Sequence, residues 1–153
     1  MLTVAGAIAK TNRPAFDAFE DSFLAYHEKQ FKRAAAFDLA MLEALGSEQA
    51  VLEIPTWPRP VTVEGPRLAD LLEAVGATGR EITLVALDGY AVEITRDALA
   101  EADWLVAIKS NGQPLALGQR GPAWLVYRHK DGRRATSDDE ARWPWSVFYI
   151  EVW

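Results

Sequence analysis

Three tryptophans of this chain lie in predicted turns that contain proline. Trp57 belongs to the turn Pro55-Thr56-Trp57-Pro58, and Trp143 and Trp145 flank Pro144. An indole in a turn can stack on a flat ligand, and it can equally cover a hydrophobic core. The three tryptophans therefore indicate either a site for a planar molecule or a packed surface.

Two arginines and a turn aspartate supply polar groups that a planar ligand would need. Arg120 precedes Gly121 in a glycine-containing loop, where the backbone can approach a ligand and a guanidinium can bind a phosphate or a carbonyl. Arg142 offers a second guanidinium. In Asp88-Gly89-Tyr90, the carboxylate of Asp88 can accept from the amino-pyrimidine edge of a heterocycle, or it can only stabilise its own turn. Each arginine is also consistent with an ordinary surface turn.

The absence of cysteine and the scarcity of histidine exclude several kinds of active site. Without cysteine there is no disulfide, thiolate nucleophile, iron–sulfur cluster or cysteine-ligated zinc. We expect His27 to face solvent and His129 to flank a hairpin, neither with a catalytic partner. The acidic run at residues 137–140 lacks the alternating ligands and the glycine of a calcium loop, and we interpret it as the start of a solvated helix. Glycine-rich nucleotide-binding motifs are also absent.

The length and the net charge of the chain limit which classes of protein it can belong to. The chain has 153 residues, half of them hydrophobic, and a formal net charge of −6. We therefore expect one domain over residues 1–153, able to bury a core without a metal or a disulfide. A negative net charge disfavours nucleic acid as the main partner. No apolar run is long enough for a membrane span, so membrane insertion is not expected.

The hydrophobic pattern predicts an α+β domain with many short strands and three short helices. We expect strands over residues 2–8, 49–54, 60–64, 82–87, 90–94, 104–108, 123–128 and 146–152. Helices are expected over 39–45, 66–75 and 95–99, with Asp38 and Thr95 as N-caps and glycine after the first two. Asn111-Gly112 predicts a type I′ hairpin. The aromatic segment 11–33 is expected to be a loop packed onto the body.

From about residue 49 onward, the order of segments resembles the molybdopterin-binding domain of the sulfite oxidase family. The resemblance covers roughly two thirds of the chain, and its pieces occur in the same order. It implies a mixed, barrel-like β-sheet domain with short helices. The matching pieces are Gly65–Gly76, Leu87–Ile94, Asp103–Ile108 with Asn111–Leu115, Arg120–Val126 and Ile150–Val152.

One departure from the family concerns its metal ligand. The family's enzymes carry a cysteine whose thiolate ligates molybdenum, and the corresponding stretch here is Val51–Trp57, with Thr56 or a neighbour in that place. A neutral hydroxyl is a poor replacement for a soft thiolate. The resemblance therefore implies the fold and a pterin pocket, without molybdenum and without an enzyme's redox chemistry.

Cysteine-less, stand-alone members of the family look like exported proteins that bind a pterin and report its presence to a membrane-bound signalling partner. The resemblance thus implies a periplasmic location with a leader removed; otherwise a cytoplasmic location is expected, since the first residues show no export signal. The alternatives are a molybdopterin-dependent oxidoreductase domain and an interaction domain whose pocket has decayed. The expected pterin-binding residues are Thr56, Trp57, Asp88, Tyr90, Arg120, Gly121, Arg142 and Trp145.

Overall fold

The computed structural model describes residues 1–153, which form eleven strands and five short helices. The strands are β1 (Leu2–Gly6), β2 (Ala34–Phe37), β3 (Glu48–Leu52), β4 (Val61–Gly65), β5 (Glu81–Ala86), β6 (Ala91–Thr95), β7 (Ala102–Ala107), β8 (Lys109–Ser110), β9 (Gln113–Pro114), β10 (Trp124–His129) and β11 (Val147–Val152). The helices are α1 (Ser22–Tyr26), α2 (Leu39–Ala44), α3 (Leu68–Ala74), α4 (Arg96–Glu101) and α5 (Ser137–Glu140). This is the expected α+β class: α2, α3 and α4 correspond to the three predicted helices, α5 forms at the acidic run interpreted as a helix start, and α1 is additional.

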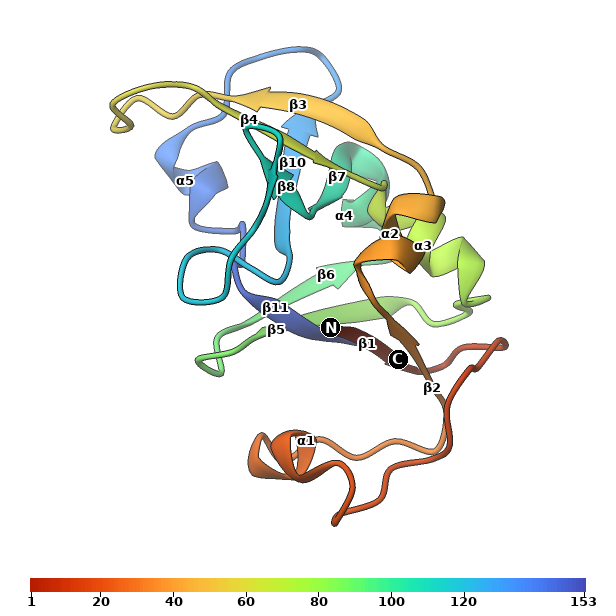
Figure 1. Cartoon of the computed structure of the whole chain (residues 1–153). Coiled ribbons are helices and arrows are strands. Elements are labelled where there is room, and N and C mark those ends of the chain that lie inside the picture. The colour runs from red at the N-terminus through yellow and green to blue at the C-terminus, as the bar shows by residue number, and fades with distance from the viewer.

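A five-stranded sheet joins the two ends of the chain. Its order is β2-β1-β11-β5-β6, and β1 and β11 run parallel while the other neighbours are antiparallel. Both termini lie in this sheet, across the middle of the molecule (Figure 1). Leu2, Val4, Ile82, Leu84 and Ile150 are buried, because one face of the sheet packs on the main core.

A second, curved layer of strands covers that core. The sheet β3-β4-β8-β9 lies beside the pair β7-β10, and the two are linked where the N–H of Val106 donates to the carbonyl of Pro66 at 2.8 Å. No barrel closes, which corrects the barrel-like expectation. β3 and β10 remain edge strands, and the carbonyl of Pro144 occupies part of the β10 edge by accepting from the N–H of Leu125 at 3.0 Å.

Local sequence explains most helix boundaries. The side chain of Asp38 accepts from the N–H of Met41 at 2.8 Å and begins α2, and the side chain of Thr95 begins α4 in the same way. α3 begins at Leu68, two residues later than predicted from Pro66, because Arg67 is extended and forms a bridge with a residue of β7. The Asn111-Gly112 turn has positive φ at both residues, 51° and 81°, as type I′ requires.

The N-terminal segment 11–33 packs beneath the five-stranded sheet (Figure 1). It is a loop, as predicted, but it also contains α1, which the sequence pattern did not indicate. Phe31 stacks on Tyr149 with ring centroids 6.4 Å apart, and Leu24 is buried in the small cluster on this face. β2, which follows the segment, was not predicted as a strand. The segment therefore covers the part of this face formed by β2, β1 and β11, whereas alternate residues of β6 stay exposed.

Candidate functional site

Four of the turns that carry predicted site residues lie on one side of the molecule, around α5 (left in Figure 1). The indole N–H of Trp57 donates to the carboxylate of Glu140. The hydroxyl of Tyr90 donates to the carbonyl of Ala141 at 2.9 Å. The β3–β4 turn and the β5–β6 turn, which are far apart in sequence, thus meet at the C-terminal end of one short helix.

The loop that carries Arg120 and Gly121 joins this arrangement. The guanidinium of Arg120 lies 4.5 Å from the ring centroid of Trp124 and 5.8 Å from that of Trp57. The carbonyl of Arg120 accepts from the N–H of Ser146 at 2.9 Å. Gly121 is buried against the backbone of Leu115, where a Cβ atom would collide with the carbonyl oxygen. Arg120 therefore lies on an aromatic surface, with its backbone held.

Trp57 is part of a packed aromatic cluster. Its ring lies 5.8 Å from that of Trp124 and 6.4 Å from that of Trp143, and Tyr127 packs edge-on against Trp143 at 5.7 Å. The indole N–H groups of Trp124 and Trp143 are buried and have no hydrogen-bond partner. The guanidinium of Arg142 lies 5.9 Å from the centroid of Tyr127. For Trp57 and Trp143, core packing thus accounts for contacts that a planar ligand would otherwise make.

Trp145 and Asp88 are predicted site residues that are open to a ligand. The side chain of Trp145 is 51% exposed, although Ser146 beside it is buried. Asp88 is exposed, and one of its carboxylate oxygens accepts from the N–H of Tyr90 at 2.9 Å, as its structural interpretation predicted. The other oxygen makes no hydrogen bond within the protein. Thr56 is exposed at the tip of the β3–β4 turn.

An apolar cleft with a volume of about 850 Å³ adjoins two of these turns. It lies between α1, the five-stranded sheet and the loop that precedes β10. Leu87 precedes Asp88, and Pro122 follows Gly121, so both predicted turns reach the rim of the cleft. The walls include Phe23, Leu24, Leu87, Leu117, Pro122 and Phe148. The cleft supplies apolar surface and almost no charge.

A buried carboxylate on α5 was missed at the level of sequence. Asp139 is 9% exposed, and its Oδ1 accepts from the hydroxyl of Tyr127 at 2.6 Å. Its Oδ2 accepts from the N–H of Thr136 and contacts Nε2 of His129, both at 2.8 Å. His129 therefore has a partner, contrary to expectation. The spacing Thr136-x-x-Asp139 forms a capping box, which is the signal that points to this aspartate.

Hydrogen bonding decides the charge state of this network. Burial alone would raise the pKa of Asp139, but the hydrogen bonds from Tyr127, His129 and Thr136 hold that pKa well below its usual range. Burial, together with the Asp139 carboxylate, raises the pKa of Tyr127 to about 12. At neutral pH the site thus contains a buried carboxylate and a protonated phenol.

The other histidine, His27, was expected to face solvent. Its ring centroid instead lies 4.7 Å from that of Phe148, and the residue is only partly exposed.

The β3–β4 turn, where the resemblance led us to look for a molybdenum ligand, offers none that suits this metal. Thr56 offers a neutral hydroxyl, and the chain has no thiolate. Histidine and carboxylate side chains form no group of three or more that could hold a metal ion. None of the helices has the length and apolar character needed to cross a membrane.

Comparison with known proteins does not assign the site. No protein-family model matches the chain, and a search of curated protein sequences gives no match.

Proposed function

We propose that this protein is a non-catalytic binding protein for a heteroaromatic ligand of the pterin class, and that it reports ligand occupancy to a membrane-bound signalling partner in the periplasm. The observation that carries the proposal is the meeting of the four predicted turns around α5, next to an apolar cleft. The order of segments further supports a fold of the sulfite oxidase molybdopterin-binding type. Small-molecule sites combine apolar walls with a few placed polar groups in the same way.

A pterin needs apolar surface for its ring and hydrogen-bond partners for its edge. The cleft provides the surface through Leu87, Leu117 and Phe148. Asp88 is adjacent to Leu87 and retains one unbonded carboxylate oxygen, which can accept from the amino group of the ring. Trp145 is the exposed indole that can stack on the ligand. Of Trp57 and Trp145, the two indoles predicted for the site, we propose Trp145 for stacking because Trp57 is already packed against Trp124 and Trp143.

The cleft also places a ligand against the N-terminal segment 11–33, which we propose changes its arrangement when the ligand binds. Phe23 and Leu24 of segment 11–33 form part of its wall. Within this segment, Arg13 forms an ion pair with Asp21 at 2.7 Å, next to the start of α1. Phe23 of α1 packs against Phe148 of the sheet, so α1 contacts its own segment and this ring. A ligand in the cleft would contact α1 directly. Occupancy then alters a surface that a signalling partner can contact.

A binding protein is favoured over a molybdopterin-dependent oxidoreductase because of Thr56. An oxidoreductase of this type would need a metal ligand at the β3–β4 turn, where the chain places an exposed hydroxyl. The residues around the cleft do not include a nucleophile paired with a base. Ligand recognition without chemistry is what this set of side chains can perform.

Calorimetric titration with reduced and oxidised pterins tests the proposal. We expect saturable binding that is weakened about tenfold or more by Trp145→Ala, since base-like rings gain ~1–3 kcal/mol from aromatic stacking. Trp57→Ala is a second variant, and affinity equal to wild type would place Trp57 outside the site. Trp153→Phe is the matched control, because Trp153 lies at the far end of β5 and contacts Thr83. Absence of binding by any pterin would refute the proposal.

A further inference from the structure

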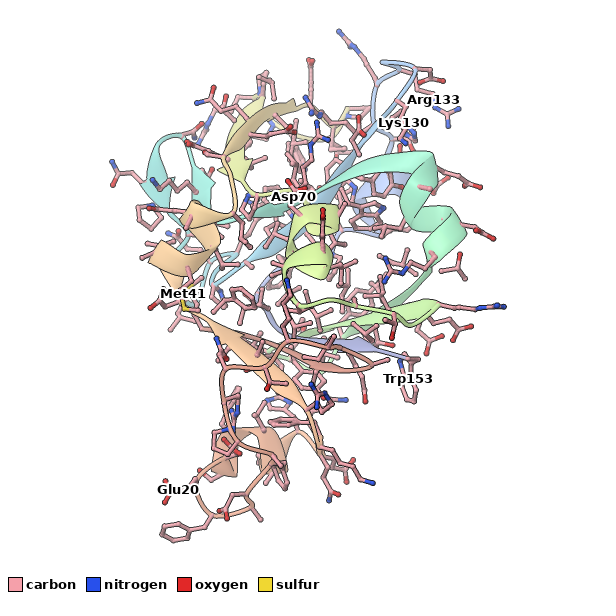
Figure 2. All side chains as sticks on the ribbon, turned by 90° about the vertical axis from the view of Figure 1, so that its right-hand side faces the viewer. Glu20, Met41, Asp70, Lys130, Arg133 and Trp153 are labelled. Carbon is pink, nitrogen blue, oxygen red and sulfur yellow. The ribbon has the colours of Figure 1, made fainter.

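A second groove lies at the end of the molecule opposite α1. It has a volume of about 410 Å³ and is lined by residues 51–53 at the end of β3, residues 127–130 at the end of β10 and the loop 132–135. Figure 2 shows Lys130 and Arg133 at this end, far from Glu20 in the N-terminal segment. Because consecutive residues of two edge strands line the groove, it exposes backbone as well as side chains.

The β3 side of the groove is an unpaired strand edge. In β4, the carbonyls of Thr62 and Glu64 accept hydrogen bonds from the N–H groups of residues 111 and 108, respectively. These carbonyls therefore point away from β3. Backbone groups alternate in direction along an antiparallel strand, so Val63 is the β4 residue that bonds with Ala50 of β3. Val51 therefore directs its N–H and its carbonyl outward, and its side chain is 65% exposed. An unpaired edge of this kind is a template for another strand.

The β10 side presents a shorter edge. By the same alternation Val126 faces β7, and Leu125, Tyr127 and His129 face outward. The N–H of Leu125 is already bound by Pro144, and the carbonyl of His129 by Gly132. The backbone of Tyr127 remains open toward the groove.

Positive charge gathers around this groove in a chain that is acidic overall. Residues 128–134 contain Arg128, Lys130, Arg133 and Arg134, against one acidic residue, Asp131. Arg133 and Arg134 have side chains 69% and 82% exposed, and their nearest carboxylates are 3.8 Å away. Most of their guanidinium donors are therefore free for an anionic partner.

We propose that this groove binds an extended acidic peptide of a partner protein, which adds to β3 as a further strand. Its backbone would pair with Val51, and its carboxylates would meet Arg133, Arg134 and Lys130. Strand addition draws affinity from main-chain hydrogen bonds and specificity from side chains. A compact phosphate group fits the groove less well, because the cationic side chains are spread along it from Arg128 to Arg134, and an extended peptide can space its carboxylates to meet them. Glu53 and Asp103, which also line the groove, disfavour any anion placed beside them. The inference does not rest on the pterin site.

A short fluorescein-labelled peptide that alternates valine and glutamate is the probe, with fluorescence anisotropy as the measurement. We expect saturable binding that weakens with added salt, and about tenfold weaker binding of a matched peptide with lysine in place of glutamate. Equal binding of the two peptides, or no binding of the acidic one, would overturn the proposal. Displacement of the acidic peptide by millimolar inorganic phosphate would reassign the groove to a small anion.

Two sets of variants separate the backbone and charge contributions. Val51→Pro removes the outward N–H and should weaken acidic-peptide binding about five- to tenfold, whereas Val51→Ala keeps the N–H and should have a smaller effect. The double variant Arg133→Glu, Arg134→Glu should abolish binding, and the double variant Lys10→Glu, Arg80→Glu, which changes net charge equally at exposed positions outside the groove, is the control. If Val51→Pro does not fold, the arginine variants, which change only exposed side chains, decide the outcome. Unchanged binding in both sets contradicts the proposal, and pterin titrations remain a separate test.

Discussion

Replacing Asp139 by asparagine should destabilise the protein strongly, although it exchanges a single heavy atom. The variant keeps the shape of the side chain and one oxygen that can accept from Tyr127. An amide nitrogen, however, takes the place of the Oδ2 that now binds the N–H of Thr136 and Nε2 of His129, each at 2.8 Å. Those two partners then lose their acceptor in a site that is largely shielded from water.

The magnitude follows from the hydrogen bonds that are lost. A hydrogen bond to a charged group contributes ~1.5–3 kcal/mol, and a buried donor left without an acceptor costs ~1–3 kcal/mol. Two such bonds are lost, but Thr136 and His129 lie near enough to the surface for water to replace part of the interaction. We therefore expect Asp139→Asn to lower the free energy of unfolding by about 2–4 kcal/mol, a large share of the ~5–15 kcal/mol that is typical of a domain.

Urea denaturation at neutral pH measures this loss, with Asp138→Asn as the matched control. Asp138 is the preceding residue of α5, carries the same charge and is exposed, so its replacement should cost less than ~1 kcal/mol. The two variants change net charge equally and differ in the burial and the hydrogen bonds of the side chain that is replaced. A cost for Asp139→Asn within ~0.5 kcal/mol of the control would refute the role given to this network.

The same variant predicts a dependence on pH. The native pKa of Asp139 is lowered from its ordinary value of 3.8, so its ionised form stabilises the folded state at pH values above about 4. This stabilisation is lost as pH falls below 4 and the carboxylate takes up a proton. The difference in stability between wild type and Asp139→Asn should therefore be constant from pH 5 to 7 and shrink below pH 4. A difference that grows on acidification contradicts the assignment.

Three smaller perturbations test other parts of the structure. Because the pKa of Tyr127 is raised from 10.0 to about 12, wild type should lose stability as pH rises between these values, and Tyr127→Phe should lose less in alkaline urea titrations. Gly121→Ala places a methyl group against the carbonyl of Leu115 and should cost about 1–3 kcal/mol in urea denaturation, together with weaker pterin binding. Thr95→Ala removes the cap that binds the N–H of Ala98 and should lower stability by about 1 kcal/mol, measured as the urea midpoint, with Thr78→Ala as the exposed control.

Elements defined by local chemistry could be predicted from the sequence. Caps at Asp38 and Thr95, the leucine spacing of α3 and the Asn111-Gly112 turn each depend on residues within a few positions of one another. β2 could not be predicted in this way. Its sequence, three alanines and a phenylalanine, has no strand preference, and it becomes a strand because residues of β1 pair with it along its whole length.

The residues of the candidate site, too, could be predicted where local chemistry defines them and could not where distant contacts do. Glycine, proline and tryptophan marked the turns, and the structure brings Trp57, Tyr90, Arg120 and Arg142 close to α5 or to its aromatic neighbours. The pairing of His129 with Asp139 depends on how the loop between β10 and α5 returns, which no local pattern specifies. The expectation of a solvated acidic helix was right for Asp138 and wrong for Asp139 for this reason.

α5 connects the two proposed sites, so their ligands should influence each other. Its residue Glu140 binds Trp57 on the pterin side, and Asp139 binds Tyr127 and His129, which line the peptide groove. Asp139 and Glu140 are adjacent in this helix of four residues, so we expect a ligand that displaces one of them to displace the other. We expect saturating pterin to change the affinity for the acidic peptide about fivefold, corresponding to a coupling of ~1 kcal/mol. Asp139→Asn should reduce that factor toward one at a temperature where it remains folded. Reciprocity supplies the control: the peptide must change pterin affinity by the same factor. Equal peptide affinity with and without bound pterin would show that α5 holds the two sites without coupling them.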